Sequence, residues 1–196
     1  MGKSSSGKDT IYKRLMKDGS LGLREIIPCT TRPIREGETD GVEYYFYTEQ
    51  QLADLEQEGK IIELRAYDTI YGIWKYFTTN EGIDLAKYDY ITISTVESYE
   101  SMQTHFGADA LVPIYIQVED GLRLQRALDR EHMQEEPGYA EVCRRFLADE
   151  ADFSDEKLRQ AGIRKRFLNQ RLPRTVEEIK TYIEQYLYIE RTKQWV

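Results

Sequence analysis

Apolar and polar residues follow two different periods along this chain, and the changes of period predict strands that alternate with helices. Ile11 and Leu15 lie four residues apart, which predicts a helix that begins near Asp9. The β-branched run at residues 90–96 predicts a strong strand, and the apolar run at residues 111–118 predicts a second one. Because helical patterns follow both runs, the chain is predicted to be an α/β protein, with a parallel sheet flanked by helices.

Shorter patterns assign the rest of the first half of the chain. Strands are predicted over residues 23–28, 42–47, 61–64 and 70–73, and helices over residues 79–87 and 97–106. A further helix is predicted to begin after Thr48, because Thr48 and Gln51 have the spacing of a capping box, and to end near Gly59.

From Asp120 onward the chain is predicted to be helical and highly charged. Pro137 and Gly138 divide the pattern into one helix that begins at Asp120 and a second over residues 139–159. The first helix combines an apolar stripe with a basic face, formed by Leu122, Leu124, Ala127 and Leu128 and by Arg123, Arg126 and Arg130. A mobile lid that closes on phosphates fits this pattern, and a surface hairpin with salt bridges fits the charge equally well. A last strand at residues 166–169 and an amphipathic C-terminal helix complete the predicted elements.

Composition removes several classes of function. A net charge of −8 and a pI near 5.0 argue against a nucleic acid as the main partner. Cys29 and Cys143 have no spacing typical of a disulfide framework or a zinc site. No apolar run has transmembrane length and no signal peptide is visible, so the cytosol is expected, without a membrane partner. No linker or repeat divides the chain, so a single domain over residues 1–196 is expected.

Gly2–Thr10 reads GKSSSGKDT and fits the GxxxxGK pattern of a phosphate-binding loop. Glycines let backbone N–H groups converge on a phosphate, and the following helix directs its positive end at the same place. Lys8 would reach the β- and γ-phosphates, whereas Asp9 stands where the motif has a magnesium-binding Ser or Thr. A buried strand should precede this loop, but only Met1 does so here. We therefore expect the first strand to be missing, and an oligomer or a partner that supplies it is an open alternative.

The segment Thr30–Phe46, TTRPIREGETDGVEYYF, concentrates a second set of phosphate-binding residues. Arg32 and Arg35 are placed to hold one doubly charged oxyanion, because guanidinium groups match phosphate oxygens bidentately. Tyr44 adds a phenolic donor. Composition alone favours a solvated charged loop before an edge strand, and the upstream phosphate loop shifts the balance toward an oxyanion site.

With both patterns present, the chain resembles a guanylate kinase, whose family shows TTRxxRxGExxGxxYxF in this segment. The resemblance is strongest over residues 2–10 and 28–72. It implies the fold of a P-loop nucleoside monophosphate kinase, with a core, a nucleoside monophosphate (NMP)-binding region and a helical lid. These parts would comprise residues 1–28, 79–119 and 160–196 for the core, 29–78 for the NMP-binding region and 120–159 for the lid.

The resemblance further implies phosphorylation of GMP or dGMP by ATP with Mg²⁺, and it implies no metal ligand from the protein. Catalytic residues would be Lys8, Arg126, Arg130 and Arg145. ATP would contact Gly2, Lys3, Ser4, Ser5, Ser6, Gly7, Lys8, Asp9, Thr10 and Asn169. GMP would contact Arg32, Arg35, Tyr44, Glu63, Tyr71, Gly72 and Thr95, with Glu63 accepting hydrogen bonds from guanine N1–H and the 2-amino group.

Besides Asp9, three positions depart from the family pattern. Pro28 and Ile73 stand where serines usually contact GMP, and Thr95 stands where the family carries a carboxylate. The phosphate anchors are therefore kept while the groups that read the base are reduced. Two hypotheses stay open: an active nucleoside monophosphate kinase, and a weak or silent domain that binds a nucleotide or a phosphopeptide through the same anchors.

Overall fold

The structure is a computed structural model that describes residues 1–35, 37–69 and 72–193; for residues 69 and 189–193 it describes the backbone alone. The chain forms two compact units. The first comprises Met1–Gly22, Ile93–Val96 and Val112–Val196, and the second comprises Leu23–Thr92 and Glu97–Leu111. The predicted lid lies in the first unit, and the predicted NMP-binding region lies in the second.

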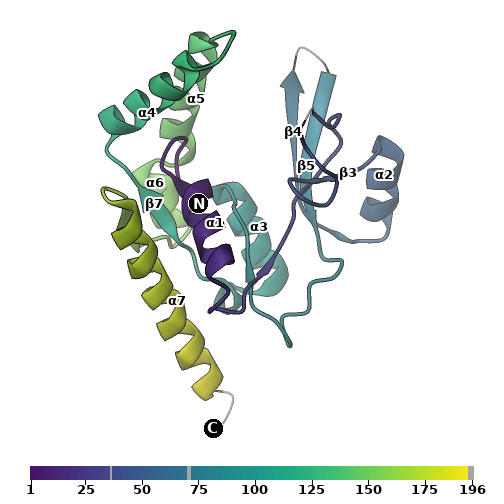
Figure 1. The fold of residues 1–196 in the computed structure, drawn as a ribbon. Helices are drawn as coiled ribbons and strands as arrows, with labels where there is room; N and C mark the ends of the chain where they lie inside the picture. The colour runs from purple at the N-terminus through teal and green to yellow at the C-terminus, as the bar shows by residue number, and fades with distance from the viewer. Residues whose placement is uncertain (36, 70–71, 194–196) are drawn as a thin grey trace. The chain divides into compact units, whose positions relative to one another are not determined.

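The first unit packs helices around one short parallel strand pair (Figure 1). Its elements are α1 (Lys8–Asp18), β7 (Tyr115–Gln117), α4 (Asp120–His132), α5 (Tyr139–Asp152), α6 (Asp155–Gln160), β8 (Arg166–Leu168) and α7 (Leu172–Lys193). Ile116 of β7 lies opposite Phe167 of β8, and α7 packs against both β8 and α1. The buried side chains include Ile11, Leu15, Ile116, Phe167 and Ile179.

Met1 extends this strand pair on the side of the phosphate loop. Its amine donates to the Ile114 carbonyl at 2.8 Å, and the Ile116 amide donates to the Met1 carbonyl at 3.0 Å. Burial lowers the pKa of the Met1 amine to about 5. These bonds fix Met1 beside β7, and with it the start of the loop.

The second unit is built on a four-stranded sheet. Its elements are β1 (Arg24–Glu25), β2 (Cys29–Thr30), β3 (Tyr45–Phe46), α2 (Glu49–Gln57), β4 (Ile61–Thr69), β5 (Gly72–Thr79), β6 (Tyr90–Ile91), most of α3 (Val96–Phe106) and the 3₁₀ turn η1 (Ala108–Ala110). The strand order is β3-β2-β5-β4, in which β2 and β3 are parallel and β5 is antiparallel to both of its neighbours. β1 and β6 form a separate parallel pair.

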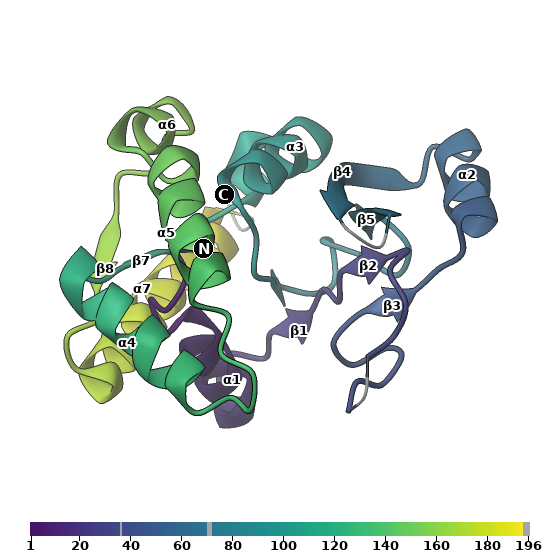
Figure 2. The ribbon, with the colours of Figure 1, turned by 90° about the horizontal axis from the view of Figure 1, so that it is seen from above.

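The two faces of the four-stranded sheet differ in character. Helix α2 covers one face and buries Cys29, Leu52, Leu55 and Phe77 (Figure 2). Thr48 caps α2 with the predicted capping box, which is thereby confirmed. Because side chains alternate along strands, the opposite face receives the cross-strand pairs Glu63–Thr78, Arg65–Tyr76 and Tyr67–Trp74. We call this second surface the polar face.

Four predicted elements are wrong or need adjustment. The helix predicted over residues 79–87 is not formed: β5 runs to Thr79, and residues 80–89 form turns. The aromatic side chains of β5 pair with β4, which keeps the chain extended to Thr79, and Gly82 at φ 74° favours a turn in place of the expected helix. The helix predicted over residues 139–159 is two helices, because Ser154 caps the start of α6.

The strands predicted at residues 90–96 and 111–118 are shorter than expected, at Tyr90–Ile91 and Tyr115–Gln117. In the part of the chain that the structure describes, no helix combines the length and apolar character that crossing a membrane requires.

Candidate functional site

The phosphate loop of the first unit depends on two glycines with positive φ. Gly2 has φ 156°, and a Cβ there would lie 2.6 Å from the Ile116 carbonyl oxygen. Gly7 has φ 84°, and a Cβ there would lie 2.6 Å from the Asn169 Nδ2 atom. A side chain at either position would collide with the neighbouring atom, so both positions require glycine.

Asn169 supports the loop from the end of β8. Its Nδ2 atom donates to the Ser6 carbonyl at 2.8 Å, and its backbone amide donates to Gln117. Ser5 Oγ, Ser6 Oγ and Asn169 Oδ1 are buried and make no hydrogen bond within the described residues. Buried polar atoms are usually hydrogen-bonded, so these three atoms suggest that the loop binds a polar ligand.

Helix α1 adds its N-terminal end to the loop. Gly7 is the N-cap and offers no side chain to the amides of the first turn. Lys8 begins the helix, and its Nζ atom lies 3.8 Å from Asp9 Oδ2. Thr10 follows in the same first turn and is exposed. A lysine and uncapped helix amides together favour an anion at this position.

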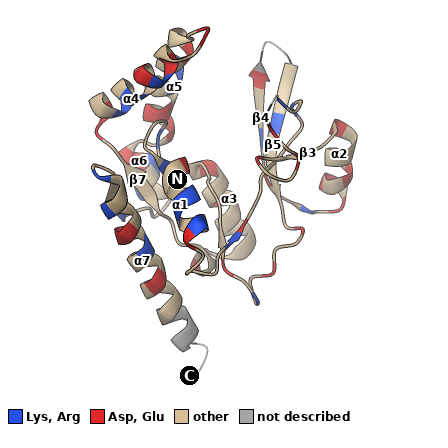
Figure 3. Cartoon of the chain, viewed as in Figure 1, with Lys and Arg blue, Asp and Glu red and all other residues tan. Residues whose placement is uncertain are grey.

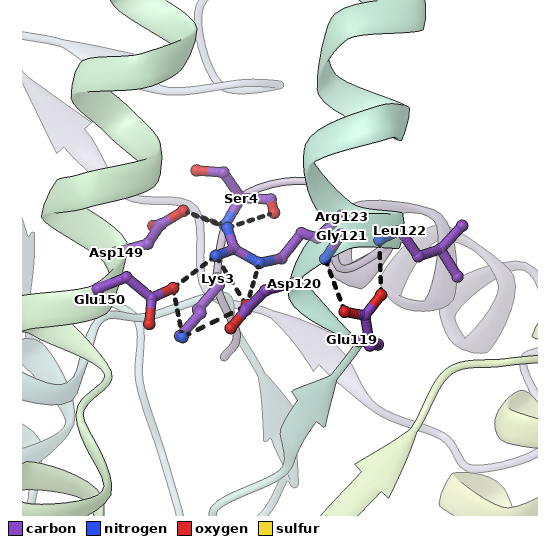
Figure 4. Close-up of polar contacts among 9 residues, drawn as sticks. All are labelled: Lys3, Ser4, Glu119, Asp120, Gly121, Leu122, Arg123, Asp149 and Glu150. Atoms are coloured by element: carbon purple, nitrogen blue, oxygen red, sulfur yellow. Dashed lines mark hydrogen bonds and ion pairs between the residues drawn. The ribbon is translucent and has the colours of Figure 1, made fainter.

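A buried arginine on α4 holds the start of the loop (Figure 4). Arg123 is only 2% exposed, although the sequence places it on a basic face beside a stripe that includes Leu122, which is 42% exposed. Its guanidinium donates to Asp149 Oδ2 at 3.0 Å, Glu150 Oε1 at 2.7 Å and Asp120 Oδ1 at 3.0 Å. Leu122 of the predicted apolar stripe is therefore exposed, whereas its ion pairs turn Arg123 of the predicted basic face inward.

The same carboxylates also contact the loop. Lys3 Nζ donates to Glu150 Oε1 at 2.6 Å, and the Ser4 amide donates to Asp149 Oδ2 at 2.8 Å. Arg123 Nη1 completes the set with a bond of 3.3 Å to the Ser4 carbonyl. Both signs of charge are interspersed along α4 and α5 in Figure 3. The network thus ties Lys3 and Ser4 of the loop to helices α4 and α5.

The three predicted lid arginines differ in their surroundings. Arg145 of α5 donates from Nη2 to Ser4 Oγ at 3.3 Å, which places it at the loop. Arg126 is half-buried on α4, and Arg130 near the end of α4 is exposed. The structure therefore brings Arg145 to the phosphate loop, and Arg126 and Arg130 keep their catalytic roles as predictions.

In the second unit, Arg32 is fixed in a polar and aromatic cluster. Its side chain is 3% exposed and donates to Glu38 at 2.7 Å from Nη1 and at 2.5 Å from Nη2. The hydrogen bonds from Arg32 lower the pKa of Glu38 to about 2. The guanidinium also lies 5.1 Å from the centre of the Tyr44 ring and 5.4 Å from that of Phe46. Arg32 is therefore held in one place before any ligand arrives.

Arg35 is more exposed and lies 5.7 Å from the centre of the Trp74 ring. It lines a groove together with Thr31, Pro33, Ile34, Glu49, Ile73 and Trp74. Arg32 and Arg35 thus come from one loop and differ in surroundings, since the first is paired and buried and the second is exposed and lines a groove.

Glu63 lies on the polar face but is already hydrogen-bonded. Its carboxylate accepts from Arg65 Nε at 2.8 Å, Arg65 Nη2 at 3.2 Å and Thr78 Oγ1 at 2.8 Å. Around this pair Tyr76 packs edge-on against Tyr44 and Tyr67, with both ring separations 5.7 Å. Sequence reasoning missed Arg65, Tyr76 and Thr78, because the strands were predicted only over residues 61–64 and 70–73, and these three residues lie beyond those bounds.

The remaining predicted GMP-binding residues, Tyr71, Gly72 and Thr95, do not all lie among the described residues of the second unit. Gly72 begins β5 with φ 106°, and Tyr71 lies outside the described residues. Thr95 belongs to the first unit, whereas Arg32, Tyr44 and Glu63 belong to the second. Over the described residues, no cluster of three or more His, Cys, Asp or Glu side chains is placed to hold a metal ion.

Comparison with known proteins gives one consistent family. The family model for guanylate kinase matches residues 1–136. A guanylate kinase of Rickettsia felis is 32% identical over 132 residues, which are 65% of this chain and 67% of that protein. A guanylate kinase of Symbiobacterium thermophilum is 40% identical over 81 residues, which are 41% of this chain and 36% of that protein.

A solved structure supports the fold independently. The crystal structure of a guanylate kinase from Anaplasma phagocytophilum matches with a TM-score of 0.60 at 18% identity. The match covers 94% of this chain and 82% of that one. The predicted fold of a P-loop nucleoside monophosphate kinase is confirmed.

Proposed function

Because this chain belongs to the guanylate kinase family of nucleoside monophosphate kinases, we propose that it transfers the γ-phosphoryl group of ATP to GMP or dGMP. The observation that carries this proposal is the oxyanion cluster of the second unit. There Arg32 is buried and fixed by Glu38, next to Tyr44 and on the same loop as Arg35. Two guanidinium groups and a phenol suit a doubly charged phosphate monoester.

The donor side of the reaction is assigned to the first unit. Gly2–Lys8 would receive the phosphates of ATP at the N-terminal end of α1, with Lys8 supplying a charge and Arg145 approaching from α5. Asn169 would contribute its Oδ1 atom at the border of this site. Phosphoryl transfer needs little covalent chemistry from a protein, so these groups act by positioning and by neutralising charge.

Magnesium would enter with ATP as part of the substrate. Mg²⁺ usually keeps several waters and binds one or two carboxylates together with substrate phosphates. Asp9 offers one exposed carboxylate beside Lys8, which fits this mode of binding and not a cage built by the protein alone. The ion would stabilise the charge that develops on the transferring phosphoryl group.

A second candidate function is binding without turnover. It is favoured by the pairing of Glu63 with Arg65 and by Thr95, which stands where the family carries a carboxylate. In this case the oxyanion cluster would hold a nucleotide or the phosphate of a phosphopeptide. The chain would then recognise a ligand that it does not convert.

A coupled assay with ATP, Mg²⁺ and each nucleoside monophosphate separates the two functions. We expect GMP or dGMP to support turnover above that of AMP and of the pyrimidine monophosphates. If no monophosphate is converted while GMP or a phosphoserine peptide still binds in a calorimetric titration, the binding function replaces the catalytic one.

Replacement of Arg35 by alanine tests the oxyanion cluster. We expect the Kd for GMP to rise about 10- to 100-fold, which corresponds to the loss of one charged hydrogen bond of about 1.5–3 kcal/mol. Lys87→Ala is the matched control, since Lys87 is exposed and pairs with Asp84 outside the sheet. Isothermal titration measures both, and equal Kd values in the two variants would remove Arg35 from the site.

A further inference from the structure

The carboxylate expected to read guanine lies beneath another side chain. The Glu63 side chain is 2% exposed, whereas that of Arg65 is 17% exposed and bonds both Glu63 oxygens. Thr78 approaches the same carboxylate from the neighbouring strand. A base arriving at the polar face therefore meets the guanidinium of Arg65 before it meets Glu63.

Glu63 has too few acceptor positions left to read guanine in the way that the family resemblance implies. A carboxylate offers about four lone-pair positions on its two oxygens. The Glu63 carboxylate already accepts three hydrogen bonds. Oε1 accepts from Arg65 and Thr78, and Oε2 accepts from Arg65. Guanine presents two adjacent donors, N1–H and the 2-amino group, and both cannot be accepted without breaking an existing bond.

Arg65 is placed to read a base in its own right. It shares the polar face with Tyr44, Tyr67 and Tyr76, and it lies directly across from Tyr76 in the strand register. Its two bonds to Glu63 hold the guanidinium in orientation and use two of its five N–H donors. A guanidinium has no acceptor, so it selects ligand groups that accept hydrogen bonds.

We propose that Arg65 is the base-selecting side chain of this chain, and that it recognises 6-oxopurines by donating to O6 and N7. This inference rests on the proposed function, because it assigns the base of the monophosphate that the oxyanion cluster holds. Arginine bonds this pair of acceptors bidentately, while adenine presents an amino donor beside N7 and is rejected. Glu63 acts as a positioning residue for Arg65.

The proposal predicts an unusual pattern of discrimination. The 2-amino group of guanine distinguishes GMP from IMP, and it is not read when Glu63 is occupied by Arg65 and Thr78. GMP and IMP should therefore bind almost equally. Removal of N7, as in 7-deaza-GMP, should weaken binding, because one acceptor for Arg65 is lost.

The test is a calorimetric titration of the full chain with GMP, IMP and 7-deaza-GMP. We expect the Kd values for GMP and IMP to agree within about threefold, and that for 7-deaza-GMP to be about tenfold higher, the scale of one charged hydrogen bond. Arg65→Met should remove the difference between GMP and 7-deaza-GMP. Lys75→Met is the control: it removes a cation paired with Glu49 on the α2 side of the same sheet, and should leave that difference unchanged.

The contrary result is equally clear. Tenfold weaker binding of IMP with undiminished binding of 7-deaza-GMP would assign recognition to Glu63, and an Arg65→Met protein that still discriminates against 7-deaza-GMP would exclude Arg65. These outcomes leave GMP binding sensitive to Arg35→Ala, so they overturn the inference alone. If none of the three nucleotides binds, both the inference and the proposed function fail. The comparison of ligands on the unmodified chain decides the matter even where Arg65→Met does not fold.

Discussion

Replacement of Arg123 by methionine is expected to lower the free energy of unfolding by about 3–5 kcal/mol, the range for breaking a buried ion pair by removing one partner. Arg123 is 2% exposed, and its guanidinium contacts the carboxylates of Asp120, Asp149 and Glu150. Asp149 is itself buried, so its charge would lose its strongest partner in a poorly solvated position. Methionine keeps much of the side-chain volume, which separates the loss of charge from the opening of a cavity.

Equilibrium unfolding in urea measures this effect, with Arg144→Met as the matched control. Arg144 lies on α5 with 67% of its side chain exposed and pairs with Glu141, so its replacement should change stability by no more than about 1 kcal/mol. The double variant Arg123→Met with Asp149→Leu should recover part of the loss, because it replaces both charges with apolar groups. Equal destabilisation by Arg123→Met and Arg144→Met would show that burial adds nothing to this network.

The features that could be predicted from the sequence are those set by local chemistry. The Thr48 capping box, the helix after Gly7 and the position of the phosphate loop follow from residue types at fixed spacings. The loop glycines belong to the same class, since their positive φ and the absence of space for a Cβ leave one residue type.

The features that could not be predicted depend on partners distant in sequence. Arg123 reads as part of a basic helix face, and only the approach of Asp149 and Glu150 from α5 makes burial favourable. The strand predicted over residues 70–73 leaves out most of β5, whereas pairing with β4 and β2 continues the strand to Thr79, the residue at which a helix was expected to begin. Tertiary pairing outweighed local propensity in that segment.

The same limit applies to the base-reading residues. Glu63 was predicted from a family pattern, and it lies on the polar face of the sheet. Its occupation by Arg65 arises because residues two apart on a strand share a face, and that requires knowing the strand to be continuous. The family resemblance pointed to the carboxylate, and only the structure showed that the carboxylate is covered.

Replacement of Lys8 by methionine is expected to lower kcat for the proposed phosphoryl transfer by about 100- to 1,000-fold, the loss typical of removing one preorganised group that stabilises transition-state charge. Lys8 is the first residue of α1, where the helix end and the loop amides already favour an anion. The KM for GMP should change little, because the proposal assigns GMP to the oxyanion cluster and Lys8 to the phosphates of ATP.

The coupled assay with ATP, Mg²⁺ and GMP measures kcat and KM for this variant and for Lys13→Met, an exposed change of the same charge on the same helix. If Lys8 contributed only to the overall electrostatic field of the protein, the two variants would have the same kcat, because both lower the net charge by one. A lysine that contacts the phosphates makes Lys8→Met alone defective in kcat. A large increase in the KM for GMP in Lys8→Met, with kcat unchanged, would place Lys8 at the acceptor and contradict its assignment to the phosphate loop.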